Sequence, residues 1–401
     1  MMLKSFLNTI KNEWNLMLKE KMIFIVVFAI PVIAGFIFGY EFSGNQLKNI
    51  SMAVVDQDNS SFSRMIIQQF NENETFNVKY YPENSDELKK LMDSSAARVG
   101  MIIPKDFGKD VKDLRSPALL MLYDGSNLSL ASTAKTKASE ILLTLRTGTF
   151  IKVLEGKLNL TPEVAEKLAL SIKFSSRTLY NPAKSFKFFF NPGLVTAVAQ
   201  TGLILMVAVA IRREEIEKQK VKRVGYVLGK IAFYSLLGTV TLTVNIIVQN
   251  KIFDIPFRGD LTTAISLSLA LATSVTVFGL LVSILLIRNK LMATTISGVL
   301  FIPNLIIVGY TWPYISLPKV YQVISPYFPY FHYVNHIRNL FLAGEPVGFL
   351  TPHFEWFGEF ILITLLLVLA GICMIKAEKP EENSETEEEG VYNGLSEITA
   401  Q

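Results

Sequence analysis

Long apolar segments are distributed unevenly along the chain. One strongly apolar segment covers residues 22–40, and the mostly polar residues 41–190 follow it. Further apolar segments crowd into residues 191–377. Because a bilayer core about 30 Å thick is crossed by a helix of roughly 20 apolar residues, this pattern predicts an α-helical membrane protein. We expect six transmembrane helices, with an α/β domain inserted between helices one and two.

The second half of the chain supplies the other predicted spans. They cover residues 193–211, 226–248, 261–287, 291–310 and 357–375. Between the last two spans, residues 311–350 combine aromatic side chains with Pro313, Pro318, Pro326 and Pro329. Prolines at this density prevent one continuous helix, and interfacial aromatic residues are typical of the membrane–water boundary. We therefore expect short, broken helices that form an extracellular re-entrant segment in residues 311–350.

Residues 41–190 have the pattern of an α/β domain. Short apolar runs that indicate strands alternate with helical stripes, which favours βαβ units and a partly parallel sheet. The predicted strands cover residues 51–56, 76–81, 98–103 and 118–123, and the predicted helices cover residues 62–70 and 84–92. From residue 126 to about residue 170 the pattern is helical again. We expect these later helices to form a stalk or a lateral cover.

Basic residues indicate how the chain is oriented. With six spans, four basic clusters fall on the same side of the membrane. They are the lysines of residues 1–21, the run in residues 212–230, Arg288 with Lys290, and Lys376 with Lys379. The side with excess Lys and Arg is cytoplasmic. The sequence therefore predicts a multi-pass protein of the cell (plasma) membrane with both termini cytoplasmic and residues 41–190 outside.

The two ends of the chain differ in character. Residues 1–21 predict an amphipathic helix whose apolar side chains, among them Phe6, Ile10 and Trp14, lie along the cytoplasmic lipid surface. Packing of this helix against other protein is the alternative. Residues 378–401 are acidic and lack an apolar periodicity, so we expect a disordered cytoplasmic tail. Partner binding by the tail is the alternative.

Several kinds of chemistry are missing from the sequence. It contains no Gly-x-x-x-x-Gly-Lys-Ser/Thr phosphate loop, so we expect this chain to bind no cofactor and not to hydrolyse ATP itself. One cysteine excludes an intrachain disulfide and a cysteine-based metal cluster. His332 and His336 have the i, i+4 spacing of two ligands on a helix, but a structural pair is favoured and we expect no metal site.

The predicted spans contain almost no ionisable side chains. Their main polar side chains are Gln200, Asn245 and Asn304. Ion-coupled transporters and proton pumps usually place charged residues on their pathway. The composition is instead typical of a passage for apolar or amphipathic cargo that is driven by energy from elsewhere.

A charged run in residues 212–223 is the candidate for receiving that energy. It reads Arg-Arg-Glu-Glu-Ile-Glu-Lys-Gln-Lys-Val-Lys-Arg, with Glu and Lys at helical i, i+3 and i+4 separations. The candidate coupling residues are Arg213, Glu214, Glu215 and Glu217. We interpret the run as a docking element for a cytoplasmic motor subunit, the alternative being a solvated loop helix whose charges only set the topology.

Local motifs along the chain are similar to those of a known family. They are Ala53-Val-Val-Asp-Gln-Asp-Asn-Ser-Ser61, Gly100-Met-Ile-Ile-Pro-Lys-Asp-Phe107, Leu122-Tyr-Asp-Gly-Ser-Asn127, Leu179-Tyr-Asn-Pro182, Asn191-Pro-Gly193, Ile324-Ser-Pro-Tyr-Phe-Pro-Tyr330 and Ile337-Arg-Asn-Leu-Phe341. In this order they resemble the permease subunits of bacterial type-2 ABC exporters, of the multidrug type with a large extracellular domain after the first span.

The resemblance implies an assembly. Two permeases, either two copies or a copy and a paralogue, would pair above two ABC ATPase subunits that bind ATP and Mg. It also implies an interface helix at residues 2–20, a coupling helix at residues 212–224, and no nucleic-acid partner. This chain keeps Arg213-Glu214-Glu215 and Gly229-Lys230 but lacks the Gly-Thr and Thr-Pro or Ser-Pro motifs that relatives place between them.

The expected function is export of a hydrophobic or amphipathic compound, powered by a separate ATPase subunit. Two alternatives remain open at this point. One is a membrane receptor or assembly factor that binds a ligand through its extracellular domain. The other is ATP-driven export of sodium or of a glycopolymer.

Overall fold

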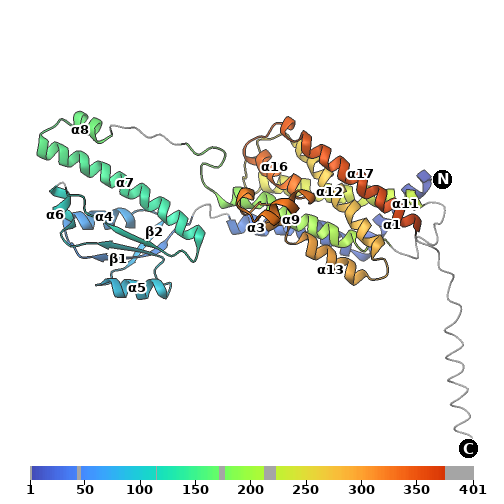
Figure 1. Cartoon of the computed structure of the whole chain (residues 1–401), viewed down its shortest axis with the longest axis horizontal. Helices are drawn as coiled ribbons and strands as arrows, with labels where there is room; N and C mark the ends of the chain where they lie inside the picture. The colour runs from blue at the N-terminus through green and yellow to red at the C-terminus, as the bar shows by residue number, and fades with distance from the viewer. Residues whose placement is uncertain (1, 43–46, 114, 171–176, 212–222, 375–401) are drawn as a thin grey trace, which may run out of the picture. The chain divides into compact units, whose positions relative to one another are not determined.

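The computed structural model describes residues 2–42, 47–113, 115–170, 177–211 and 223–374. The chain divides into two compact units (Figure 1). Residues Gly44–Phe186 form the first, which we call the α/β unit. Residues Met1–Ser43 and Lys187–Gln401 form the second, which we call the membrane unit. The sequence analysis placed the insert at residues 41–190.

A four-stranded sheet forms the centre of the α/β unit. Its strands are β1 (Ile50–Asp56), β2 (Phe76–Tyr80), β3 (Val99–Ile103) and β4 (Leu120–Tyr123). They lie in the order β2-β1-β3-β4. Strand β1 is parallel to both β2 and β3, whereas β4 is antiparallel to β3. All four predicted strands are present, and the prediction of a partly parallel sheet is confirmed.

Helices cover both faces of this sheet because successive side chains of a strand point to opposite faces. Met52 and Val54 of β1 point to one face, where they share a core with α4 (Ser61–Asn71), α6 (Phe107–Lys112) and α7 (Leu128–Leu158). Ala53 and Val55 point to the other face, where they contact α5 (Ser85–Asp93). Figure 1 shows α4 and α7 on the side of the sheet opposite to α5. The short helix α8 (Pro162–Ala169) packs on α7.

The turn after β1 is held by its own polar side chains. The Oδ1 atom of Asp56 accepts hydrogen bonds from the N–H groups of Asp58 and Asn59, each at 3.0 Å. Ser60 caps α4, since its Oγ accepts from the N–H groups of Phe62 and Ser63 at 3.1 Å. These side chains therefore end β1 in a tight turn and begin α4.

In the described part of the membrane unit, six helices are long and apolar enough to cross a membrane, which agrees with the six predicted spans. The first covers Met22–Glu41. The others are α9 (Phe186–Val207), α11 (Arg223–Lys251), α12 (Leu261–Leu285), the segment Lys290–Ile307 and α17 (Thr351–Met374).

The first span is interrupted where a proline requires it. Its parts are α2 (Met22–Phe24), a π-helical turn η1 (Ile25–Ala29) and α3 (Ile30–Glu41). Pro31 has no N–H group to donate to the carbonyl of Val27, four residues earlier. The Oγ1 of Thr241 in α11 lies 3.1 Å from that carbonyl and 2.9 Å from the carbonyl of Leu237 in its own helix, so its hydrogen is shared between the two. A neighbouring helix therefore helps to satisfy the backbone group that the proline leaves free.

The fifth span, expected over residues 291–310, covers Lys290–Ile307 and consists of two helical pieces. Helix α13 (Lys290–Phe301) ends before Pro303, and α14 (Asn304–Ile307) is a separate turn. A proline at this position cannot continue the hydrogen-bond ladder of α13. Short helices then follow, as predicted for residues 311–350: η3 (Tyr314–Ser316), α15 (Lys319–Ile324), η4 (Ser325–Tyr327), α16 (Phe331–Leu342) and η5 (Val347–Phe349).

Candidate functional site

The N-terminal helix packs tightly along the third span. Helix α1 (Met2–Glu20) buries one face, formed by Ser5, Thr9, Glu13 and Met17 at i, i+4 spacing. Gly229 of α11 lies opposite this face, and a Cβ atom there would lie 2.7 Å from the Cβ of Thr9. Because any larger side chain at this glycine would overlap α1, the two helices can approach only with small residues in the contact.

A buried ion pair lies at the centre of this contact. Glu13 of α1 and Lys230 of α11 form a salt bridge, and their side chains are 3% and 1% exposed. The hydroxyl of Tyr234 donates to the Oε2 of Glu13 at 2.9 Å. The ammonium group of Lys230 also lies 4.8 Å from the ring centroid of Tyr226. Burying two charges is favourable only when they are paired and hydrogen-bonded, so this cluster, which we call the α1–α11 ion pair, specifies how α1 docks.

The predicted interface residues lie outside the buried face of α1. Trp14 is 53% exposed within the chain, and Phe6 and Ile10 are partly buried. Leu3, Leu7 and Leu18 are exposed as well. Helix α1 thus turns a polar face inward and apolar side chains outward, the reverse of a helix on a soluble protein. Contact of these side chains with lipid stays a prediction.

Sequence reasoning missed Glu13 and Lys230. A signal was present, because Ser5, Thr9 and Glu13 recur at i, i+4 spacing and so lie on one face of the helix. Lys230 is the only charged residue within the predicted span 226–248. A single charge within a membrane helix usually has a partner.

The predicted coupling residues Arg213, Glu214, Glu215 and Glu217 lie outside the described residues. The residues that flank this segment are well anchored. The backbone N–H of Ile211 donates to the Oγ of Ser283 at 3.1 Å. The guanidinium of Arg223 donates to the carbonyl oxygen of Ile372 at 2.8 Å, near the C-terminal end of α17. A cation at this end of a helix satisfies carbonyls that the helix itself leaves free.

Buried amide side chains form a second group of functional candidates. Gln200 of α9 and Asn304 of α14 are 2% and 0% exposed, and among the described residues neither amide has a hydrogen-bond partner for its nitrogen or oxygen. Asn245 of α11 donates to the carbonyl of Thr241 at 3.0 Å, but its Oδ1 has no partner. An unpaired buried polar group costs about 1–3 kcal/mol. Polar groups retained inside a membrane at this cost are functional candidates.

A tyrosine hydroxyl bonds to the backbone of α9 next to a proline inside that helix. Pro192 lies inside α9, and the N–H of Gly193 donates to the hydroxyl of Tyr310 at 2.9 Å. That hydroxyl donates in turn to the carbonyl of Phe189 at 2.5 Å. The hydroxyl of Tyr330 donates to the carbonyl of Gly193 at 2.8 Å. The Asn-Pro-Gly motif therefore joins α9 to residues 311–350 and to Tyr310 at the end of the fifth span.

The three histidines of the chain meet in one place. The Nδ1 atoms of His332 and His353 lie 2.9 Å apart, and the Nδ1 of His336 lies 2.9 Å from the Oε2 of Glu345. Burial lowers the pKa of His332, which favours its neutral form at pH 7. In the described part of the chain, no group of three or more His, Cys, Asp or Glu side chains has a geometry that could hold a metal ion. The histidines thus form a hydrogen-bonded junction between α16 and α17.

Comparison with known proteins adds to this picture. The family described as ABC-2 family transporter protein matches residues 21–375. The chain is 22% identical over 304 residues to the probable multidrug ABC transporter permease YbhR of Escherichia coli, covering 74% of this chain and 79% of the relative. It is 22% identical over 343 residues to the probable multidrug ABC transporter permease YbhS of the same organism, covering 83% of this chain and 87% of the relative.

A third relative comes from another organism. The chain is 22% identical over 367 residues to the linearmycin resistance permease protein LnrN of Bacillus subtilis, covering 84% of this chain and 90% of the relative. The match to the family extends over both units and all six candidate spans, from the start of the first span to the end of the last. The chain therefore belongs to the ABC-2 family of transporter proteins.

Proposed function

We propose that this chain is the membrane permease subunit of an ATP-driven exporter that moves a hydrophobic or amphipathic compound out of the cell. Its family membership makes it a multi-pass permease of an ABC transporter. Relatives named for multidrug transport and for linearmycin resistance support a cargo of this chemical class. The buried, unpartnered amides of Gln200 and Asn304 are the observation that carries the proposal, because cargo with an apolar body and few polar groups could satisfy them.

The energy would come from a separate ATPase chain. The sequence has no phosphate loop, and residues 212–222 connect two anchored ends, Ile211 and Arg223. A displacement of this segment by the ATPase would be transmitted to α11, to which α1 is joined through the α1–α11 ion pair. We propose that Arg213, Glu214, Glu215 and Glu217 contact the ATPase. A second permease, either a copy of this chain or a paralogue, would complete the pathway.

The proposed topology places both termini in the cytoplasm and the α/β unit outside the cell. The basic clusters of the sequence support this orientation. In this arrangement the α1–α11 ion pair lies near the cytoplasmic side, close in sequence to the coupling segment.

The first test concerns the ATPase. Affinity purification of the chain from its native membranes is expected to retain an ATP-binding chain, identified by mass spectrometry, and vanadate-sensitive ATP hydrolysis. Replacing Glu214, Glu215 and Glu217 together by Gln is expected to remove both, because it removes three charges from the proposed contact. The matched control replaces three acidic residues of the tail, Glu381, Glu382 and Glu385, by Gln and is expected to retain both. Sustained cargo export by a preparation that contains no ATPase would contradict the proposal.

The second test concerns the buried amides. Gln200→Leu and Asn304→Leu are expected to slow efflux of the amphipathic dye rhodamine 6G about tenfold, the equivalent of one lost hydrogen bond of about 1.4 kcal/mol to the cargo. Neither variant should lower thermal stability, because each removes polar atoms that have no partner among the described residues.

Thr239→Val is the control for these variants. Thr239 is also buried in a span, but its hydroxyl donates to the carbonyl of Ser235 in its own helix at 2.7 Å. This variant is expected to leave efflux unchanged. If the leucine variants lose stability while efflux per folded molecule is unchanged, the amides have a structural role and the proposed pathway is wrong.

A further inference from the structure

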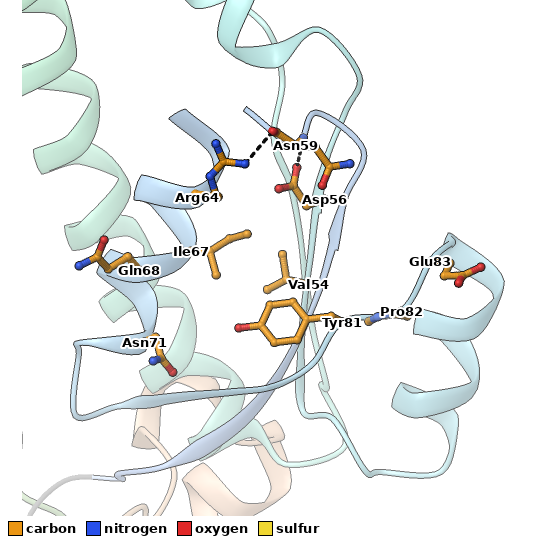
Figure 2. A pocket seen from close by; sticks show the side chains of 10 residues that line it. All are labelled: Val54, Asp56, Asn59, Arg64, Ile67, Gln68, Asn71, Tyr81, Pro82 and Glu83. Atoms are coloured by element: carbon orange, nitrogen blue, oxygen red, sulfur yellow. Dashed lines mark hydrogen bonds between the residues drawn. The ribbon is translucent and has the colours of Figure 1, made fainter. Parts of the chain in front are cut away.

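The α/β unit contains a hollow of about 670 Å³ at one end of its sheet. Its walls come from the end of β1, from α4 and from the loop that follows β2 (Figure 2). This volume is within the range of pockets that hold small molecules, about 300–1,000 Å³.

The topology of the sheet explains why the hollow is there. The chain leaves β1 toward α4 on one face of the sheet and leaves the adjacent parallel strand β2 toward α5 on the other. Loops that diverge from two neighbouring parallel strands leave a crevice at the carboxyl ends of those strands, and α/β proteins bind their ligands in this crevice. Asp56 ends β1, and Tyr81 and Pro82 follow β2, so the hollow lies at this switch point.

The centre of the hollow is apolar. Figure 2 shows the ring of Tyr81 beside Val54, with Ile67 of α4 nearby. Tyr81 is 62% exposed although its ring faces these aliphatic side chains. An aromatic ring with an aliphatic floor can cover the apolar body of a ligand, while its hydroxyl stays in water.

Charged residues lie at the rim. Arg64 comes from α4, and its Nη1 donates to the carbonyl of Asn59 at 3.0 Å, which positions the guanidinium and leaves further N–H donors for an anion. Glu83 lies across Tyr81 from Arg64, and its exposed carboxylate extends toward α5, so it would reach a ligand by turning its side chain toward the hollow (Figure 2). The Asp56 carboxylate, by contrast, accepts from the turn after β1 and from the Oγ of Ser63 at 2.7 Å. The hydrogen bonds of this carboxylate therefore stabilise the turn after β1 and the start of α4.

We propose that this hollow binds a small zwitterionic molecule with an apolar body, the chemical class of a short hydrophobic peptide with free ends. The body would lie on Val54, Ile67 and Tyr81, its carboxylate would pair with Arg64, and its amine would pair with Glu83. Two opposite charges at the rim disfavour a ligand of single charge, because it would leave one of the two rim charges unpaired. The proposal makes no statement about the exported cargo and does not depend on it.

The test uses the full chain in lipid nanodiscs and equilibrium dialysis with the tritiated tripeptide Leu-Phe-Leu. Saturable binding is expected. Amidating the carboxyl end or replacing Arg64 by Gln should each weaken it about tenfold, and so should acetylating the amine or replacing Glu83 by Gln. Tyr81→Ala should abolish binding, whereas Tyr81→Phe should retain it because only the ring is needed.

Matched variants make this test specific. Arg146→Gln on α7 and Glu163→Gln on α8 change exposed side chains of the same unit away from the hollow and should leave binding unchanged. Arg64→Gln should not weaken the amidated peptide further, since the group that it would pair with is already absent. Binding that is equal for free and blocked peptides, or that survives Tyr81→Ala, would overturn the proposal, as would the absence of saturable binding.

Discussion

Replacing Lys230 by Met is expected to destabilise the membrane unit by about 3–5 kcal/mol. The substitution would leave the carboxylate of Glu13 without its cation at a position where that side chain is 3% exposed. Tyr234 would still donate one hydrogen bond to it, which does not neutralise its charge. The measurement is the thermal unfolding midpoint of the detergent-solubilised chain, together with the yield of monodisperse protein.

A second variant separates the charge from the packing. The double substitution Glu13→Gln with Lys230→Met removes both charges, and it is expected to recover most of the lost stability because no unpaired charge remains. Lys137→Met is the control, since its salt bridge with Glu140 lies on the exposed surface of α7 and contributes at most about 1 kcal/mol. If Lys230→Met is no more harmful than Lys137→Met, α1 does not dock on α11 through this pair.

The α1–α11 ion pair also bears on function. Under the proposed function, α1 lies at the membrane surface and α11 follows the coupling segment directly. A pair that is buried and bonded to Tyr234 would transmit a displacement of one helix to the other. Retention of ATPase activity with loss of efflux in the double variant would identify this step.

Gly193→Ala is expected to lower the stability of the membrane unit by about 3 kcal/mol or more. A Cβ atom at this position would overlap the ring of Tyr310, which is 1% exposed and has no room to move. Displacing that ring would also break the hydrogen bonds that its hydroxyl makes with the N–H of Gly193 and the carbonyl of Phe189. Thermal unfolding in detergent measures the loss.

Gly358→Ala is the matched control for this variant. Gly358 lies inside α17, and a Cβ atom there would have nothing within 4 Å. Alanine in a helix interior is favoured over glycine by about 1 kcal/mol, so this variant should be as stable as the parent or more stable. Equal behaviour of the two variants would mean that Tyr310 does not pack on α9 as described.

Much of the architecture can be predicted from the sequence. The apolar segments predict six spans, since membrane helices satisfy their backbone groups internally and need only length and hydropathy. The four strands are readable for a similar reason, because short alternating runs bounded by turn residues are local signals. Pro303 shows the limit of hydropathy, which does not reveal a break in a helix between two equally apolar segments.

Only some of the candidate functional residues could be predicted from the sequence. Gln200, Asn245 and Asn304 stood out as the polar residues of the spans, and all three are buried with unpaired atoms. Glu13 was overlooked, because the apolar stripe of α1 suggests that its contact face is apolar. Tyr310 and Gly193 are 117 residues apart, and no local pattern indicates that they meet.

The sequence by itself determined that this chain is a six-span permease with an α/β insert, that it has no phosphate loop of its own, and which polar residues interrupt its spans. These features depend on local composition and on spacing along the chain. Only the tertiary structure decided which groups meet across it. It pairs Glu13 with Lys230, places the hydroxyl of Tyr310 against the backbone of α9 beside Pro192, and opens a hollow at the ends of β1 and β2. The reason is physical. The energy of a buried charge or of a free backbone group, and the shape of a crevice, depend on the groups that surround them, and the fold brings those groups together from distant parts of the sequence.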